Sequence, residues 1–388
     1  MAATDGNSPS RLRPVLAAVL TILILAPAGM LFFRVWQQNA DERDGTEREQ
    51  QGVEYLGGLA PLISALTETQ SSALQGVSAA PASLTSAVGK MAAIDQRIGA
   101  DLGTRERWTG LRDRINQLGS VTGDPLQIYQ ANVEVTNLTL ALYKSVADSS
   151  TLSRDPDNDL SHLQQAFARD LPNTTVMVSR MGDLALMLQK LTGSDQRTTQ
   201  ARATLLPQFG ASVLSVNDSV AALTDNLQAA VDDTESTTLS GSLVTTVDAF
   251  RRGVEAFIRG ASPGGSSAPN AAAMATAQSQ LQTSLASLSG VLVREMRGLL
   301  DSRIDRLDGR RIEAIIMGAL AVLLALAVVL LVTTGRRATR TGPAREPLSL
   351  ADSLPNGRDP FAASARDSSP PYGTEVGPDR RERSGALR

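Results

Sequence analysis

Two stretches of sequence decide the fold: residues 15–33, VLAAVLTILILAPAGMLFF, and residues 314–332, AIIMGALAVLLALAVVLLV. Each stretch is 19 residues long and contains no charged side chain. About 20 apolar residues in a helix are enough to cross a hydrocarbon core of about 30 Å. The sequence therefore predicts two transmembrane helices, at residues 14–34 and 312–334, with the bilayer as a partner of the chain.

The charges around these stretches predict their orientation. Arginines precede the first stretch and acidic residues follow it, whereas four arginines follow the second: Arg336, Arg337, Arg340 and Arg345. Because cytoplasmic flanks carry the excess of Lys and Arg, we predict that residues 1–13 and 335–388 are cytoplasmic and that residues 35–311 lie outside the inner (plasma) membrane. A cleaved signal peptide at Ala26-Pro27-Ala28 is the alternative, but the apolar run continues to Phe33, which favours an uncleaved anchor.

The segment 35–311 has the period of helices rather than strands. Apolar residues recur at steps of three and four along several stretches, such as Leu126 to Ala147, Phe209 to Leu227, Leu243 to Phe257 and Leu281 to Leu299. Such stripes are the seams of helical bundles. Turn residues at 80–83, 119–125, 155–159, 193–194 and 262–269 separate about seven helices. We predict an all-α fold, with two stacked four-helix-type bundles and outer helices that run without a break into the spans.

Composition excludes several classes of function. The chain has no cysteine, one histidine (His162), 3% aromatic residues and a formal net charge of −3. Disulfides, thiolate catalysis and multi-histidine metal sites are thereby excluded, and the charge gives no reason to expect nucleic-acid binding. No nucleotide-binding loop or nucleophile motif is present, so we predict no enzyme activity, catalytic residue, metal or cofactor. The segment 335–388 is rich in Pro, Ser, Gly and Arg, which predicts a disordered tail.

Three motifs in the same order resemble one family. They are Glu49–Leu56 (EQQGVEYL), Ser149–Asp159 (SSTLSRDPDND) with Asp170-Leu171-Pro172 and Arg180 after it, and Leu299–Leu307 (LLDSRIDRL). These motifs resemble the extracytoplasmic helical sensory domain of bacterial methyl-accepting chemotaxis receptors and membrane sensor histidine kinases. The paired tyrosines of that family are absent, and Leu160-Ser161-His162 stand near their place.

The resemblance implies a receptor-like sensor outside the membrane. Because only the short tail follows the second span, we expect output through a separate cytoplasmic or membrane partner. A small anionic or organic ligand outside and a homodimer are further expectations. The alternative is a structural or scaffolding membrane protein whose helical domain acts as a spacer, and this reading predicts a bundle without an interhelical cavity.

Five residues are candidate ligand contacts. Asp155, Asp157 and Asp159 have the spacing of a calcium loop, but Leu160 and Ala166 stand where such a loop needs Gly and Glu, so a turn and helix cap explain them better.

His162 is a candidate for a ligand contact or pH switch, against an ordinary polar helix position. The guanidinium of Arg180 is suited to an anionic ligand between helices, against a solvated helix face.

Overall fold

The computed structural model describes residues 12–77, 79–152, 158–233, 237–261 and 269–334. All secondary structure in these ranges is helical, which confirms the all-α prediction. The elements are α1 (Leu12–Leu74), α2 (Ala82–Ile98), α3 (Arg105–Leu118), α4 (Pro125–Ser149), α5 (Asn158–Gln165), the π-helix η1 (Ala166–Asp170), α6 (Leu171–Lys190), α7 (Gln196–Asp233), α8 (Thr237–Ala261) and α9 (Ala271–Thr334). Residues 1–330 form one compact unit and 331–388 a second, of which only the end of α9 is described.

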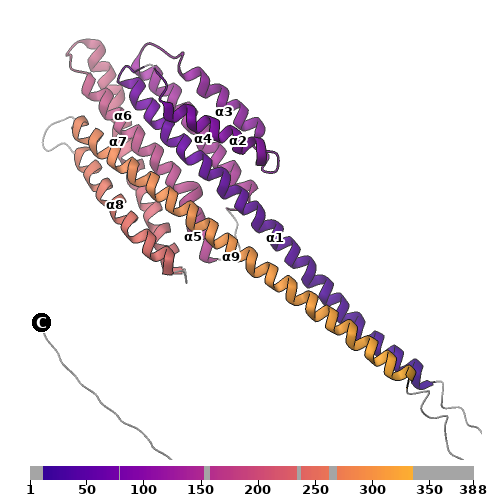
Figure 1. Cartoon of the computed structure of the whole chain (residues 1–388). Helices are drawn as coiled ribbons and strands as arrows, with labels where there is room; N and C mark the ends of the chain where they lie inside the picture. Colours follow the sequence, from indigo (N-terminus) through magenta and orange to yellow (C-terminus); the bar gives the residue numbers. More distant parts are fainter. Residues whose placement is uncertain (1–11, 78, 153–157, 234–236, 262–268, 335–388) are drawn as a thin grey trace, which may run out of the picture. The chain divides into compact units, whose positions relative to one another are not determined.

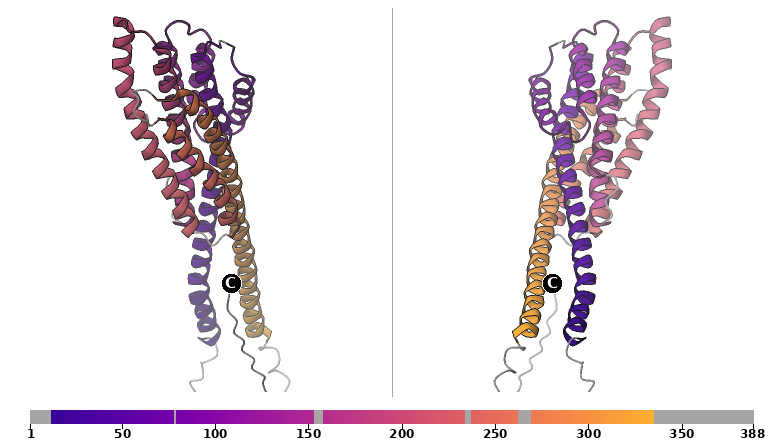
Figure 2. Two further views of the ribbon diagram at one scale, coloured as in Figure 1. Left: turned by 90° about the vertical axis from the view of Figure 1, so that its left-hand side faces the viewer. Right: turned by 90° about the vertical axis from the view of Figure 1, so that its right-hand side faces the viewer.

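Two long helices run the length of the first unit. α1 has 63 residues and α9 has 64, and they lie side by side in opposite directions (Figure 1; Figure 2). The helix of α1 continues past Pro27 and Pro61. The prediction that the outer helices run unbroken into the apolar stretches is therefore confirmed.

The predicted seams are buried. Tyr129, Thr136 and Tyr143 of α4, and Leu281, Leu288 and Met296 of α9, are each less than a tenth exposed. The buried apolar side chains form one connected cluster that extends from Val53 to Leu300. α1 packs against α2, α4 and α6, and α6 packs against α7. The apolar period in the sequence thus locates the core correctly.

The central helix is α6, which is buried almost all round: 14 of its 20 residues are buried. A helix of this kind belongs in the middle of a bundle, because every face needs an apolar neighbour. A π-helical turn precedes it, in which the N–H of Leu171 donates to the carbonyl of Ala166, five residues back. Pro172 explains the irregular turn, since its ring removes a backbone donor and crowds the preceding turn.

One break in the helices is not predicted from the sequence. The chain turns between α2 and α3 at residues 99–104, where Gly103 has a φ of +65°. The hydroxyl of Thr104 donates to the Asp95 carboxylate at 2.8 Å and closes this corner. Breaks at 80–83, 119–125 and 193–194 are confirmed, whereas much of 155–159 and 262–269 lies outside the described residues.

One helix in the described part of the chain is long and apolar enough to cross a membrane. It is α9, within Ala271–Val328, and the apolar window that meets this test is not buried by the rest of the molecule. The predicted first span, 14–34, falls in α1, but many of its side chains lie outside the described residues. The two-pass topology therefore stays a prediction, as does the nature of segment 335–388, which also lies outside them.

Candidate functional site

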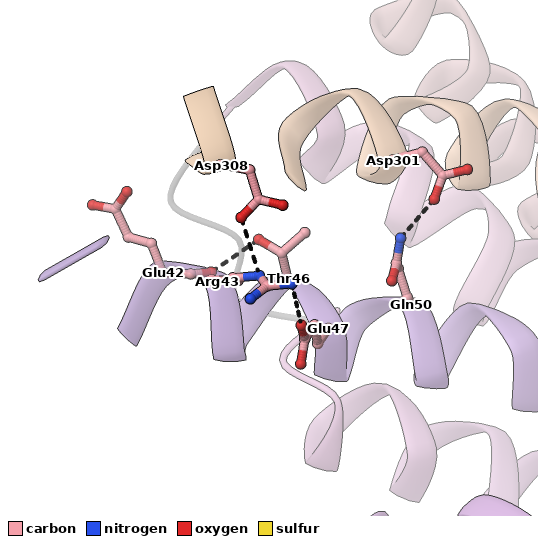
Figure 3. A network of polar contacts seen from close by, with 7 residues as sticks. All are labelled: Glu42, Arg43, Thr46, Glu47, Gln50, Asp301 and Asp308. Carbon is pink, nitrogen blue, oxygen red and sulfur yellow. Dashed lines mark hydrogen bonds and ion pairs between the residues drawn. The ribbon is translucent and has the colours of Figure 1, made fainter. Parts of the chain in front are cut away.

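Polar side chains join α1 to α9 close to the apolar stretches 15–33 and 314–332. The amide of Gln50 donates to the Asp301 carboxylate at 2.6 Å, and the Arg43 guanidinium lies 3.5 Å from Asp308 (Figure 3). The Asn39 amide donates to the carbonyl of Leu307 at 3.1 Å. Polar groups that pair across two helices fix their register, because a slip would leave them without partners.

The register of the two helices is constant over a long distance. A Cβ atom at Gly318 would lie 3.1 Å from the Phe32 ring, and one at Gly57 would lie 3.5 Å from Val293. The step from Phe32 to Gly57 is 25 residues, and the step from Gly318 back to Val293 is also 25. At about 1.5 Å per residue, this paired segment is about 37 Å long.

A cleft opens between α1 and α9 at the far end of this paired segment. It has a volume of about 790 Å³ and is also lined by α2, α4 and α6. Small residues of the two long helices, such as Gly57, Ala60, Ala286 and Gly290, leave this space. We call it the α1–α9 cleft. A volume of this size is typical of small-molecule sites.

A second cavity adjoins the α1–α9 cleft. It has a volume of about 380 Å³ and shares Glu68, Ser279 and Gln282 with the cleft. Its walls come from α1, α6 and α9, and Asp183 of α6 is one of the lining residues. We call it the Asp183 pocket. The two long helices therefore line both cavities.

Asp183 is 1% exposed, and hydroxyl groups surround its carboxylate. Ser71 of α1 donates to one oxygen at 2.7 Å and Ser179 to the other at 3.2 Å. Burial raises the pKa of Asp183 to about 7, although hydrogen bonds from Ser71, Ser179 and Gln70 lower it in part. The carboxyl is therefore close to half ionised at neutral pH.

The guanidinium of Arg180 points to α4. Its terminal nitrogen donates to Thr136 at 3.0 Å and to Asn137 at 2.6 Å, and lies 3.4 Å from the carbonyl of Val133. Burial lowers the pKa of Arg180, and Tyr129 raises it. Burial likewise raises the pKa of Tyr129 to about 12. Arg180 thus connects α6 to α4 and is half-buried, not solvated. Its role as a ligand contact stays a prediction.

His162 lies on α5 in a polar chain. Its Nδ1 is 3.0 Å from the Asn226 amide oxygen, and the Asn226 amide nitrogen donates to Asp170 at 2.7 Å. Burial raises the pKa of Asp170, whereas the Asn226 hydrogen bond and Arg169 lower it. These contacts join α5 and the π-helical turn to α7. His162 therefore has a structural role at this position.

The structure does not test whether the three predicted aspartates lie close to His162. Asp155 and Asp157 lie outside the described residues, as does the side chain of Asp159. A cavity of about 640 Å³ is present nearby, lined by residues of α4, α5, η1 and α6 that include Lys144 and Arg169. The described residues contain no group of three or more His, Cys, Asp or Glu that could hold a metal ion.

The sequence reasoning missed Asp183 and both cavities of the two long helices. A signal for Asp183 was present, because it is the one charged residue in the otherwise apolar run Met181–Leu188 (MGDLALML), where a side chain is expected to be buried. The cavities had no such signal, since they depend on how five helices pack.

No protein-family model, curated protein or solved structure matches this chain. The resemblance to chemoreceptor sensory domains therefore rests on the quoted motifs alone.

Proposed function

We propose that this protein is a receptor-like membrane protein that binds a small organic ligand outside the inner membrane. In this proposal residues 14–34 and 312–334 span the bilayer, residues 35–311 form the extracytoplasmic helical domain, and both termini are cytoplasmic. The helical domain comprises two four-helix-type bundles that share the long helices. Ligand binding changes the packing of α1 against α9, and a separate partner in or below the membrane responds to the change.

The observation that carries the proposal is the position of the α1–α9 cleft. The two helices that line it, α1 and α9, are the same helices that stay in constant register as far as Phe32 and Gly318. A ligand between them acts directly on the elements that enter the apolar region. Small sliding of packed helices is an established way to carry a signal.

The aromatic side chains at the end of the paired segment support the membrane position. Trp36 stacks on Phe32, with ring centroids 6.1 Å apart, and the Arg311 guanidinium lies 4.6 Å from the centre of the Trp36 ring. Tryptophan is enriched where a membrane helix leaves the hydrocarbon. This pair lies at the boundary that the sequence predicts for both spans.

The absence of cysteine from the chain gives a direct test. Two double variants, Gly57→Cys with Val293→Cys and Asn39→Cys with Leu307→Cys, report on the cleft and on the membrane-proximal segment. Oxidative crosslinking is measured in membrane vesicles, with and without amino acids, organic acids and amines. We expect at least one ligand class to change the crosslinking yield of both pairs.

Two controls make the test decisive. The pair Gly57→Cys with Arg297→Cys is one helical turn out of register and should give a low yield in every condition. If no ligand class changes either in-register pair, the receptor proposal is wrong and the scaffolding function is favoured.

The topology has its own measurement. A cysteine at exposed Gly89 should react in intact cells with a maleimide that does not cross membranes, whereas one at Gly342 should react only after the cells are permeabilised. Equal labelling of both positions in intact cells would contradict the proposed orientation.

A further inference from the structure

We infer that the Asp183 pocket is a binding site for a small organic cation with an ammonium group, and that the buried carboxylate of Asp183 is its counter-ion. This inference rests on the proposed function, since it names the chemical class of the ligand. Its support is the set of side chains that line the pocket.

The charge of the pocket is negative. Its two ionisable lining residues are Glu68 of α1 and Asp183 of α6, and neither lysine, arginine nor histidine lines it among the described residues. The groups that hydrogen-bond to the Asp183 carboxylate are the neutral side chains of Ser71, Ser179 and Gln70. A buried carboxylate without a cationic partner is costly, and a cationic ligand would remove that cost.

The two basic side chains of α6, Arg180 and Lys190, hydrogen-bond to other groups. The terminal nitrogen of Arg180 donates to acceptors on α4, and Lys190 donates to the carbonyl of Leu74 at 2.6 Å. Both stabilise contacts between helices, and neither is among the groups that shift the pKa of Asp183. We therefore assign the position beside the Asp183 carboxylate to a positively charged ligand.

The remaining lining residues suit an ammonium group on a short carbon chain. An ammonium group donates three hydrogen bonds, and four glutamines, whose amide groups are able to accept them, line the pocket: Gln75, Gln189, Gln278 and Gln282. Ala271, Ala272 and Ala275 supply small apolar surface for methylene groups. The volume of about 380 Å³ corresponds to about a dozen water-sized groups of about 30 Å³ each.

The pocket lies where three helices meet. Ser71 comes from α1, Asp183 from α6 and Gln278 from α9, and Gly182 allows Gln278 to pack directly against α6. A Cβ atom at Gly182 would overlap the Gln278 side chain. A cation held between these groups would draw α1 and α9 toward α6.

The test uses the full chain in lipid nanodiscs and isothermal calorimetry with butylamine and 1,4-diaminobutane. Butanol and butyrate have similar carbon chains without the positive charge, and magnesium chloride tests an inorganic cation. We expect saturable binding of the amines alone. Saturable binding of butyrate, butanol or magnesium at this pocket, or no binding of either amine, would overturn the inference.

Two pairs of variants locate the site. Asp183→Asn should weaken amine binding about tenfold or more, because a charge-assisted hydrogen bond is lost, whereas exposed Asp218→Asn should leave it unchanged. Ala275→Leu fills the pocket and should also weaken binding, whereas Ala273→Leu, on the same exposed stretch of α9 but outside the pocket, should not. Equal affinity in all four variants contradicts the assignment.

The two proposals fail in different ways. If amines bind but crosslinking between α1 and α9 does not respond to any ligand, the cation site stands and the receptor function is wrong. If another ligand class changes the crosslinking while no amine binds, the receptor function stands and the cation site is wrong.

Discussion

Glu49 of α1 and Arg303 of α9 form an ion pair in the interior of the bundle, with 3.6 Å between the carboxylate and guanidinium atoms. The side chain of Glu49 is 5% exposed and that of Arg303 is 16% exposed. The pair lies between the membrane-proximal contacts of Arg43 and the α1–α9 cleft. It therefore helps to hold the register on which the proposed signal depends.

Loss of either partner should be costly. Glu49→Gln or Arg303→Met alone leaves one charge buried, and we expect a loss of about 3 kcal/mol in the free energy of unfolding. The double variant Glu49→Leu with Arg303→Met should recover most of that loss. Denaturation of the chain in detergent, followed by circular dichroism, measures the difference.

An exposed ion pair supplies the control. Arg114 and Glu134 lie 3.7 Å apart with side chains more than half exposed, so Arg114→Met should cost less than about 1 kcal/mol. A similar cost for both pairs would show that burial does not determine the strength of the Glu49–Arg303 contact.

Much of the fold follows from the period of apolar residues. Seams such as Leu281 to Leu299 place the core because a helix repeats its face every three or four residues. The corner at residues 99–104 was missed although Gly99 and Gly103 mark a break there, and the hydrogen bond that closes it joins Thr104 to Asp95, nine residues apart. The π-helical turn was missed although Pro172 marks it.

The candidate site is much less predictable than the fold. Arg180 was singled out from a motif, and the structure places it between α6 and α4. Asp183, three residues later, faces Ser71 of α1, more than 100 residues away in the sequence. Contacts over such a separation depend on tertiary packing, which a single sequence does not specify.

The hydroxyl of Tyr55 should be important for stability. It donates to the buried carboxylate of Asp95 at 2.8 Å, and burial raises the pKa of Tyr55. We expect Tyr55→Phe to lower the free energy of unfolding by about 2 kcal/mol, because a hydrogen bond to a charged group is lost. Tyr143→Phe is the matched control, since the Tyr143 hydroxyl is 3.4 Å from the Leu56 carbonyl and should contribute about 0.5 kcal/mol. Equal losses in thermal melts of the two variants would contradict this assignment.

Substitution of two glycines of α1 by alanine should change the stability of the chain in opposite directions. A Cβ atom at Gly52 would overlap Ser150 and Leu152, whereas one at Gly45 would meet nothing within 4 Å. Gly52→Ala should therefore destabilise the chain by about 2 kcal/mol through overpacking. Gly45→Ala should stabilise it by about 0.5 kcal/mol, because alanine favours the helix. Thermal melts of both variants test this prediction. A stabilised Gly52→Ala would show that α1 is not in close contact with Ser150 and Leu152, which follow α4.

The ionisation of Asp183 predicts how stability changes with pH. Its pKa in the folded chain is raised from 3.8 to about 7, so the folded state binds a proton more tightly than the unfolded state. The contribution of Asp183 to the free energy of unfolding is then fully present below about pH 4. It falls by about 4 kcal/mol in all as the pH rises to about 7. Asp170, whose pKa is also raised, acts in the same direction, so a variant is needed to isolate Asp183.

Asp183→Asn removes this ionisation and keeps the shape of the side chain. Relative to the unaltered chain without ligand, its stability should improve by about 2.5 kcal/mol more at pH 8 than at pH 5, because only the carboxylate is destabilised by burial. Urea denaturation at the two pH values measures this difference, and exposed Asp218→Asn should show none. An amine should reduce the advantage of the variant at pH 8, since a bound cation stabilises the ionised form of Asp183. Parallel pH profiles for Asp183→Asn and the unaltered chain would mean that the carboxyl is ionised in the folded state as readily as in water, and that burial does not govern its charge.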